Sequence, residues 1–523
     1  MYTMRSTSGL FVFVAFLIAL TKCSRLLVVF PMEAPSHYNL GSSLAKGLAE
    51  AGHDVTIIAS FKEKSITKGL KYREVYLDGF YEERKKQFKE MNLFKMTNIP
   101  MIMRLPFMNS MGNDITERTF AHPKIQKLLD DQNEKFDAVI VENFINDAMK
   151  YFAYHFKAPL ISFSPVGANA WVNILVGNPA PPSYIPNAFM DYSSQMTFFE
   201  RVLNNLFDVI SSLNTHLIFF PGQNKILHKY FPNAPDISDL LYNNSLVLLN
   251  SHVSTTFPVP LLPNMINIGG FHVKPAKTLP KDLKDFIEGA KHGVIYFSMG
   301  SNLQSKDLPE NIRNNLMNTF KSLKERVIWK FEDENLPGKP NNVLISKWLP
   351  QNDILGHPNV KLFITHGGLL STTETIYHGV PVLTIPIFGD QKMNANQMIQ
   401  HGFGQSISYE DLNEENNIRT AINEMLTNTK YKNNAKQRSK IMHDQPNKPM
   451  DTAIFWIEYV IRHNGAPHLR TAGLDLAWYQ YISLDVYAFV ISVSILVVLI
   501  LSKLFKICCR KTKTKTDKVK KNN

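Results

Sequence analysis

Short apolar runs alternate with helix-length segments along most of this chain, and this alternation restricts its fold more than any other feature. The first stretch, residues 25–60, reads RLLVVFPMEAPSHYNLGSSLAKGLAEAGHDVTIIAS. An apolar run, a loop with Pro31 and Pro35, a helical pattern and a second apolar run after Gly52 predict a strand–helix–strand unit. Because such units build parallel sheets, the pattern predicts an α/β fold.

The pattern continues and then restarts, which predicts two domains. The runs FDAVIVE and APLISFS extend the first half, and a connector containing Pro and Lys follows at residues 272–285. Beyond it come GVIYFSMGS, RVIWKF, NVLISKWLP, NVKLFITHGG and GVPVLTIPIFGDQ. A chain of 523 residues is long enough for two such domains. We expect doubly wound, Rossmann-like domains at residues 24–272 and 273–450, then C-terminal helices and a juxtamembrane segment at 451–485.

Both ends of the chain carry targeting patterns. Residues 1–23 hold Arg5 in a short polar lead and then an apolar run, which is typical of a cleavable secretory signal. Residues 486–505 are apolar except for Lys503, and as a helix they rise ~30 Å, which matches the hydrocarbon thickness of a bilayer. The basic tail at 506–523 predicts a cytoplasmic C-terminus. We therefore expect a single-pass type I membrane protein with lumenal domains.

The same tail explains most of the net charge of +12. Residues 503–523 contribute +8 of it, because nine Lys or Arg stand against Asp517 alone. No basic stripe with interleaved aromatics remains, so nucleic acid is not an expected partner. The chain ends in Lys520, Lys521, Asn522 and Asn523, which is the pattern of a dilysine signal for the endoplasmic reticulum. Simple solvation of a Lys-rich tail is the other interpretation.

Cysteines and glycosylation sequons fit this location. The three cysteines, Cys23, Cys508 and Cys509, lie near the two ends of the chain. The middle therefore contains neither a disulfide framework nor a thiolate metal site. Asn243 begins the sequon Asn-Asn-Ser, which a lumenal protein can use for N-glycosylation.

Residues 198–220, FFERVLNNLFDVISSLNTHLIFF, form an apolar-rich stretch with helical spacing. Two interpretations of it stay open on the sequence alone. The helix lies in a membrane interface, or it is buried in the protein beside a ligand pocket.

The densest chemical pattern lies in residues 348–391. A strand runs into His366-Gly367-Gly368, and a helix follows it. Glycines at such a turn let backbone amides approach an anion, and the helix N-terminus adds partial positive charge, so the turn is a phosphate cradle in physical terms. Around it lie groups suited to a nucleotide and a sugar: an indole, two amides and two carboxylates, namely Trp348, Gln351, Glu374, Asp390 and Gln391.

These residues also carry a family resemblance. The block from Phe363 to Gln391, with its spaced His, Gly, Glu, two Pro and terminal Asp-Gln, resembles the signature of the UDP-glycosyltransferase family. The resemblance extends over nearly the whole chain, including PLLPNMINIGG and YFSMGS. It is strongest to the membrane-bound, glucuronosyltransferase-like branch and to insect members. It implies a GT-B type fold, in which the two domains face each other across a cleft, and a UDP-sugar as co-substrate.

The family's roles transfer to matching positions. By resemblance, the uracil is held by Trp348 and Gln351, the ribose by Glu374, the diphosphate by Ser301, His366 and Ser371 with the Gly368 turn, and the hexose by Asp390 and Gln391. One departure is Leu370, where many members carry an Asn that hydrogen-bonds near the phosphates and sugar.

The resemblance also places a catalytic base at His37, in the loop that follows the first strand. An imidazole has a pKa suited to accepting a proton from a hydroxyl near neutral pH. The family usually orients this His with an Asp at the end of the FDxxxxD strand, where this chain has Glu142. Asp147 is the second candidate, and a site with neither carboxylate is the third.

The implied reaction is an inverting transfer of a hexose from a UDP-sugar to a small lipophilic acceptor. No Asp-x-Asp triplet occurs in the chain, and we expect neither a metal nor another cofactor. Mammalian glucuronosyl members carry an Arg shortly before PLLPN, and the aligned residue here is Asn250, which favours UDP-glucose over UDP-glucuronic acid.

The resemblance also implies that the chain can form a homo-oligomer.

Two rival functions remain. A silent member of the family would bind the UDP-sugar or a lipophile as a partner subunit. An oxidoreductase would need G-x-G-x-x-G after the first strand, where this chain reads PMEAPSHYNLGSS.

Overall fold

The computed structural model describes residues 23–63, 66–91, 93–94 and 101–520, with the backbone alone at 88–91, 101–102 and 508–520. The predicted signal sequence, apart from Cys23, lies outside the described residues, as do the last three residues of the predicted dilysine signal. The chain divides into two units, Met1–Leu469 and Arg470–Asn523, and each is considered by itself.

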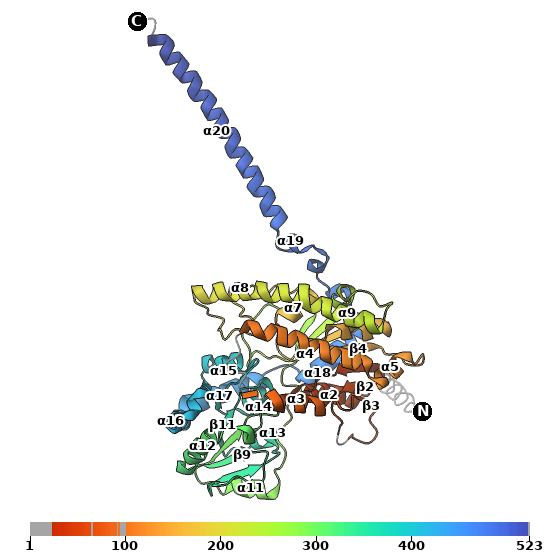
Figure 1. Cartoon of the computed structure of the whole chain (residues 1–523), viewed down its shortest axis with the longest axis vertical. Helices are drawn as coiled ribbons and strands as arrows, with labels where there is room; N and C mark the ends of the chain where they lie inside the picture. Colours follow the sequence, from red (N-terminus) through yellow and green to blue (C-terminus); the bar gives the residue numbers. More distant parts are fainter. Residues whose placement is uncertain (1–22, 64–65, 92, 95–100, 521–523) are drawn as a thin grey trace, which may run out of the picture. The chain divides into compact units, whose positions relative to one another are not determined.

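A seven-stranded parallel sheet forms the first half of the first unit (Figure 1). Its strand order is β3-β2-β1-β4-β5-β6-β7. The strands are β1 (Arg25–Phe30), β2 (Asp54–Ala59), β3 (Tyr72–Tyr76), β4 (Ala138–Glu142), β5 (Leu160–Ser164), β6 (Asn244–Leu249) and β7 (Met265–Asn267). Alternate residues of β1 pack in different cores. Leu27 and Val29 are buried in the core on one face of the sheet, and Leu26 and Val28 are buried in the core on the other face. The sheet is therefore covered on both faces, as its continuous apolar strands predicted.

Helices cover both faces of this sheet. One face carries α2 (Pro35–Glu50), whose Leu40, Leu44 and Leu48 are buried. Ten of the described helical segments lie over and around the other face, and they contribute Phe120, Leu129, Phe152 and Leu227 to its core. They are α3 (Phe80–Met91), α4 (Met101–Ala121), α5 (Pro123–Asp130), η2 (Asp147–Lys150), α6 (Tyr151–His155), α7 (Ala170–Val176), α8 (Phe198–Asn214), η3 (Thr215–Phe219), α9 (Phe220–Tyr230) and α10 (Ile237–Leu241).

A six-stranded parallel sheet forms the second half, in the order β10-β9-β8-β11-β12-β13. Its strands are β8 (Val294–Ser298), β9 (Arg326–Lys330), β10 (Val343–Ser346), β11 (Val360–Thr365), β12 (Val382–Thr384) and β13 (Gly404–Ser406). Its helical segments are α11 (Lys281–Glu288), η4 (Ser305–Asp307), α12 (Glu310–Ser322), α13 (Gln351–Leu355), α14 (Leu369–His378), α15 (Gln391–Gln400), η5 (Glu410–Asn413), α16 (Glu415–Thr427) and α17 (Thr429–His443). The predicted α/β class with two doubly wound sheets is confirmed.

Helix α18 (Pro449–Arg462) follows the second sheet in the chain but packs on the first. Its Ala453, Ile457 and Val460 are buried in the same core as α2. The sequence prediction grouped 451–485 apart from both domains. Helix spacing of apolar residues shows that a face is buried, but it does not show against which sheet.

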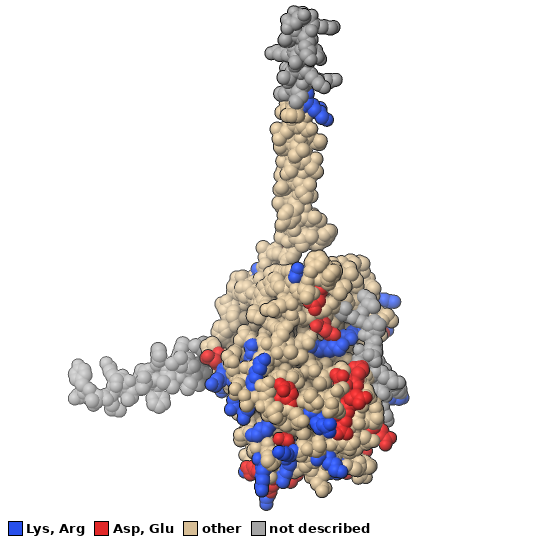
Figure 2. All heavy atoms as spheres, turned by 90° about the vertical axis from the view of Figure 1, so that its left-hand side faces the viewer, with Lys and Arg blue, Asp and Glu red and all other residues tan. Residues whose placement is uncertain are grey.

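The second unit consists of η7 (Ala472–Asp475), α19 (Trp478–Tyr481) and the long helix α20 (Leu484–Lys520), and η6 (Pro467–Leu469) ends the first unit. Within α20, Leu484–Ile507 has a mean hydropathy of 2.7 and is long enough to cross a membrane. Figure 2 shows this part of the helix without charged side chains until its far end. The sequence prediction of an apolar C-terminal helix suited to a membrane span is confirmed.

Candidate active site

Each sheet has one point where its connections change direction, and both points carry predicted site residues. In the first sheet this point lies between β1 and β4, and in the second between β8 and β11. Ligands of open α/β sheets bind outside the carboxyl ends of such strands. His37 follows β1 and Glu142 ends β4, whereas Ser301 follows β8 and His366 follows β11.

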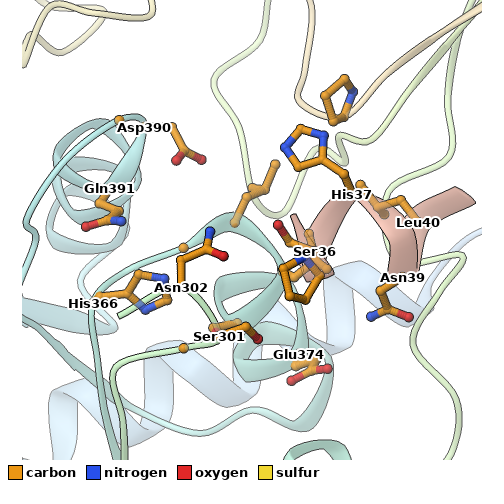
Figure 3. A pocket seen from close by; sticks show the side chains of 18 of the residues that line it. Ser36, His37, Asn39, Leu40, Ser301, Asn302, His366, Glu374, Asp390 and Gln391 are labelled. Atoms are coloured by element: carbon orange, nitrogen blue, oxygen red, sulfur yellow. The ribbon is translucent and has the colours of Figure 1, made fainter. Parts of the chain in front are cut away.

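A cavity of about 750 Å³ joins the two sets of residues. Figure 3 shows His37 projecting from α2 on one side, and Ser301, His366, Glu374, Asp390 and Gln391 on the other. Of the predicted site residues, the structure places these on the cavity wall: His37, Ser301, Trp348, Gln351, His366, Gly368, Ser371, Glu374, Asp390 and Gln391. Glu142 lies behind His37 and has no exposed surface.

His37 and Glu142 are in direct contact. Nδ1 of His37 is hydrogen-bonded to Oε1 of Glu142, and the ring packs against Phe144 at 4.7 Å between centroids. The other carboxylate oxygen of Glu142 is buried without a hydrogen-bond partner among the described residues. This hydrogen bond orients the imidazole. It involves Nδ1, so Nε2 remains for a ligand in the cavity that His37 lines.

The sequence analysis placed His37 in a loop, but it lies in the first turn of α2. The helix begins at Pro35, whose fixed φ suits the first helical position and whose missing N–H is not needed there. A helical backbone holds the imidazole more rigidly than a loop would.

Asp147, the second candidate partner of His37, is engaged elsewhere. Its carboxylate pairs with the ammonium of Lys150, which is 1% exposed and also donates to Oδ1 of Asn143 at 2.6 Å. A buried ammonium needs such partners because its desolvation is costly. Asp147 therefore has a structural role that Glu142 does not have.

His366 fills a narrow space between two glycines. A Cβ on Gly300 would lie 2.4 Å from the imidazole, and one on Gly368 would lie 2.7 Å from it. Gly300 also has φ +86°, which disfavours any other residue. Burial, and then the charge of Lys330, lower the pKa of His366 to about 4. The ring is therefore neutral at physiological pH and acts as a hydrogen-bonding group.

Gln351, Ser371 and Glu374 form one hydrogen-bonded group. Nε2 of Gln351 donates to Oγ of Ser371 at 3.1 Å and to Oε2 of Glu374 at 2.6 Å. Burial raises the pKa of Glu374 to about 7, although the hydrogen bond from Gln351 opposes this shift. Beside this group, Trp348 is 72% exposed. A flat aromatic surface next to three polar groups suits a nucleoside.

Asp390 is the N-cap residue of α15 and Gln391 is the first residue of that helix, and in Figure 3 Asp390 lies across the cavity from His37. Burial raises the pKa of Asp390 above its usual value, and the hydrogen bond from Asn394 only partly offsets this rise. The side-chain oxygen of Gln391 accepts from the backbone amides of Ile387 and Phe388, at 2.7 and 3.1 Å. Gln391 therefore holds the loop that presents Asp390, a role the sequence did not indicate.

Three further neighbours of the site were missed in the sequence. Asn394 links the site loops by donating to Asp390 at 2.8 Å and to the Gly367 carbonyl at 3.0 Å. Lys330 ends β9 and donates to the Gly300 carbonyl at 2.9 Å, and Phe144 packs on His37. The position of Lys330 at the carboxyl end of a strand beside β8 was a usable signal.

Asn250 lies away from the cavity, whereas Leu370 is on its wall. Asn250 is 2% exposed, donates to the Pro165 carbonyl at 3.0 Å and is not part of the cavity wall. Leu370 packs against the core around α2 and also lines the cavity, so it contributes apolar contact where other members hydrogen-bond. Asn243 is exposed directly before β6, where a glycan can be attached.

The first-domain side of the cavity is mostly apolar. Leu40, Phe107, Met108, Met111, Phe144, Val166, Trp171 and Phe189 line it. Such a wall binds a lipophilic molecule and leaves few polar groups to specify it. Among the side chains that the structure describes, no three His, Cys, Asp or Glu are placed to hold a metal ion.

Known proteins were compared with this chain. The family model described as "UDP-glucoronosyl and UDP-glucosyl transferase" matches residues 25–519. UDP-glycosyltransferase UGT5 of Dactylopius coccus is 39% identical over 93% of this chain and 92% of its own length. UDP-glucosyltransferase 2 of the same organism is 36% identical over 90% of each chain.

A solved structure agrees with the fold. Glycosyltransferase VinC in complex with DTDP has a TM-score of 0.54 and covers 84% of this chain and all of that one. At 17% identity the likeness concerns the fold alone. Together with the two parallel sheets, it confirms the predicted GT-B type architecture.

Proposed function

Since the chain belongs to the family of UDP-glucuronosyl and UDP-glucosyl transferases and is a UDP-glycosyltransferase, we propose that it transfers glucose from UDP-glucose to a small lipophilic hydroxyl compound. The anomeric configuration inverts in this reaction. The observation that carries the proposal is the His37–Glu142 hydrogen bond, because His37 lines the same cavity as the nucleotide-binding candidates.

His37 is the proposed catalytic base. Ionised Glu142 accepts from Nδ1–H, so the lone pair of Nε2 is free to accept a proton. As the acceptor oxygen forms its bond to the anomeric carbon, its proton moves to Nε2. Glu142 then stabilises the imidazolium that forms, and this charge pairing inside a buried site lowers the barrier.

The second domain stabilises the leaving group. The bond between the anomeric carbon and the phosphate oxygen breaks, and UDP departs with the electron pair. The N-terminus of α14 at Gly368 offers backbone amides and partial positive charge to the developing phosphate charge. Ser301, Ser371 and neutral His366 add hydrogen bonds, and we propose that no metal is needed.

The remaining groups bind the nucleoside and the hexose. Trp348 stacks on the uracil, Gln351 pairs with its edge, and Glu374 accepts from the ribose hydroxyls. Asp390 accepts from the hexose hydroxyls, held in place by Gln391 and Asn394. These assignments need the Gln351–Glu374 hydrogen bond to rearrange when the nucleotide binds.

The name of a relative supports glucose as the donor, because a protein that is 36% identical is named a glucosyltransferase. Asp390 does not distinguish the two donors, because the terminal Asp-Gln belongs to the signature in which this chain resembles glucuronosyltransferase-like members as well. Asn250 does not line the cavity, so its neutral side chain says little about the donor.

The rival function is a silent partner subunit that binds UDP-sugar without transferring it. The His37–Glu142 pair favours an enzyme, because a binding protein gains nothing from an imidazole against a fully buried carboxylate. The apolar wall of the cavity favours a lipophilic acceptor.

We also propose that α20 anchors the enzyme in the endoplasmic reticulum membrane, with both domains in the lumen.

A donor competition tests the proposal. Membranes containing the full chain are given a phenol acceptor with UDP-glucose, UDP-glucuronic acid or an equal mixture, with and without EDTA. We expect EDTA-insensitive transfer that favours glucose by ~10-fold or more. Preference for glucuronic acid would overturn the donor assignment, and UDP binding without transfer to a panel of phenols and alcohols would favour the silent subunit.

A further inference from the structure

Helix α8 and the π-helical turn η3 present a long apolar surface outside the catalytic cleft. In Figure 1, α8 lies at an edge of the first unit, beyond α4 and α7. Nine apolar side chains on it are between 47% and 76% exposed. This apolar stripe consists of Phe198, Phe199, Val202, Leu203, Leu206, Val209, Leu213, Leu217 and Ile218.

The apolar stripe carries no charge. The only other exposed residues between 198 and 218 are Asn205, Ser212 and His216, so no Lys, Arg, Asp or Glu is among them. At 1.5 Å per residue the stripe is ~30 Å long. Soluble monomers rarely expose a continuous apolar patch of this size, and those that do use it for binding.

The opposite face of α8 fixes its orientation. Asn204 is fully buried and donates to the carbonyls of Pro182 and Ile185, at 2.7 and 3.0 Å. Phe207 packs with Leu105 and Met190. Turning the stripe inward would break these hydrogen bonds and expose this core, so the stripe faces outward in the folded protein.

A lipid bilayer is the occupant that the observations favour. Residues 470–483 separate the first unit from the apolar helix Leu484–Ile507, and fully extended they span ~50 Å at most. If that helix spans a membrane, it holds Leu469, the last residue of the first unit, within that distance of the membrane surface. A protein partner would normally meet charged groups at such a surface, and none of the exposed residues between 198 and 218 is charged, whereas acyl chains need no hydrogen bonds.

We propose that the apolar stripe of α8 and η3 docks the catalytic unit in the plane of a bilayer interface. The stripe would bury its side chains among acyl chains while the Asn204 face stays packed on the protein. Glu200 and Arg201, both only partly exposed, add no net charge near its start. Docking is therefore driven by apolar burial, and it does not require anionic lipids.

A depth-sensitive fluorescent probe tests this proposal in the full chain. Cys23, Cys508 and Cys509 are changed to Ser, Leu206→Cys carries an NBD label, and the protein is placed in phosphatidylcholine vesicles. Leu206 is 55% exposed, so the substitution leaves the core intact. The matched control is Thr420→Cys, an exposed position on α16 of the second sheet. Unchanged glycosyl transfer and circular dichroism show that both labelled proteins are folded.

We expect blue-shifted emission at position 206 and quenching by doxyl-labelled phosphatidylcholine that is at least threefold stronger than at position 420, independent of salt. Water-like emission and equal quenching at both positions would overturn the proposal. Blue-shifted emission that doxyl lipid does not quench, and that disappears when the protein is diluted into more lipid, would also overturn it. That result would assign the stripe to a second copy of the chain.

Discussion

The two switch points of this protein lie at equivalent places in similar sheets but are chemically opposite. At the β1–β4 point, His37 is hydrogen-bonded to the carboxylate of Glu142, which has no exposed surface. At the β8–β11 point, a neutral histidine sits between glycines beside a helix N-terminus. The first can move a proton, and the second can receive an anion. One backbone arrangement thus supports acceptor activation in one domain and leaving-group stabilisation in the other.

We expect the two sites to tolerate different changes. The proton-transfer site depends on one pair of side chains, so we expect substitutions of only these two residues to cause a large loss of activity. The anion site depends on backbone amides and close approach, so its most sensitive positions are glycines. Variants of single residues separate the two contributions.

Loss of the base is expected to have the largest effect. His37→Ala should lower kcat/KM by ~10³-fold, because general base catalysis contributes about 10²–10⁴. It also leaves Glu142 buried without a partner, so His37→Gln, which keeps an amide donor, is the control for folding. Both variants should bind UDP as the parent does, as measured by calorimetry. Loss of UDP binding in His37→Gln would show that the two sites are not separable.

The two carboxylates near His37 should behave differently. Glu142→Gln removes the negative charge beside the imidazole and should lower kcat by ~10²-fold with little change in the UDP dissociation constant. Asp147→Asn deprives buried Lys150 of its partner and should instead lower the free energy of unfolding by ~3 kcal/mol. Denaturant unfolding and kcat per folded molecule measure the two effects. The reverse pattern would make Asp147 the partner of His37.

At the anion site, a single methyl group should weaken binding. Gly300→Ala places a Cβ 2.4 Å from His366 and strains a residue with φ +86°, so the UDP dissociation constant should rise ~10-fold. Gly338→Ala is the matched control, because its φ is +77° but its Cβ meets nothing within 4 Å. Equal losses in both variants would attribute the effect to backbone strain alone.

The smallest effect concerns the pH dependence of stability. The pKa of Glu374 is about 7 in the folded chain and about 4.5 when unfolded, so the folded state binds more protons between these values. This group therefore makes the protein less stable as pH rises from about 4.5 to 7. Glu374→Gln should gain ~2 °C in Tm relative to the parent between pH 5 and pH 8 without UDP. A Tm difference that does not change with pH would contradict the raised pKa.

Much of the fold followed from the sequence because its signals are local. Continuous apolar runs with helix-length connections define parallel strands wherever they lie, and the residues that follow the strands collect at one edge. His366 was found in this way, whereas the family resemblance pointed to His37 and Ser301. The sequence pattern placed His37 in a loop, whereas the helix already begins at Pro35, because this boundary depends on a proline that loops also use.

Other features required distant parts of the chain to meet. Glu142 and Asp147 are both plausible partners of His37 in the sequence, and only the packed structure places Lys150 against one and His37 against the other. Gln391 is a local case, because its side chain accepts from backbone amides only four and three residues earlier, in a turn for which the sequence has no recognised pattern. Hydrogen bonds between residues far apart leave no periodic pattern, so they cannot be read from spacing.

The α/β class, the two sheets, the apolar helix and the nucleotide-binding motif could be predicted from the sequence, because apolar periodicity and turn residues act over short distances. The packing of α18 on the first sheet and the outward orientation of the apolar stripe of α8 follow only from the tertiary structure. Both helices have an apolar face, and only the competition for burial against neighbouring elements decides which face is covered.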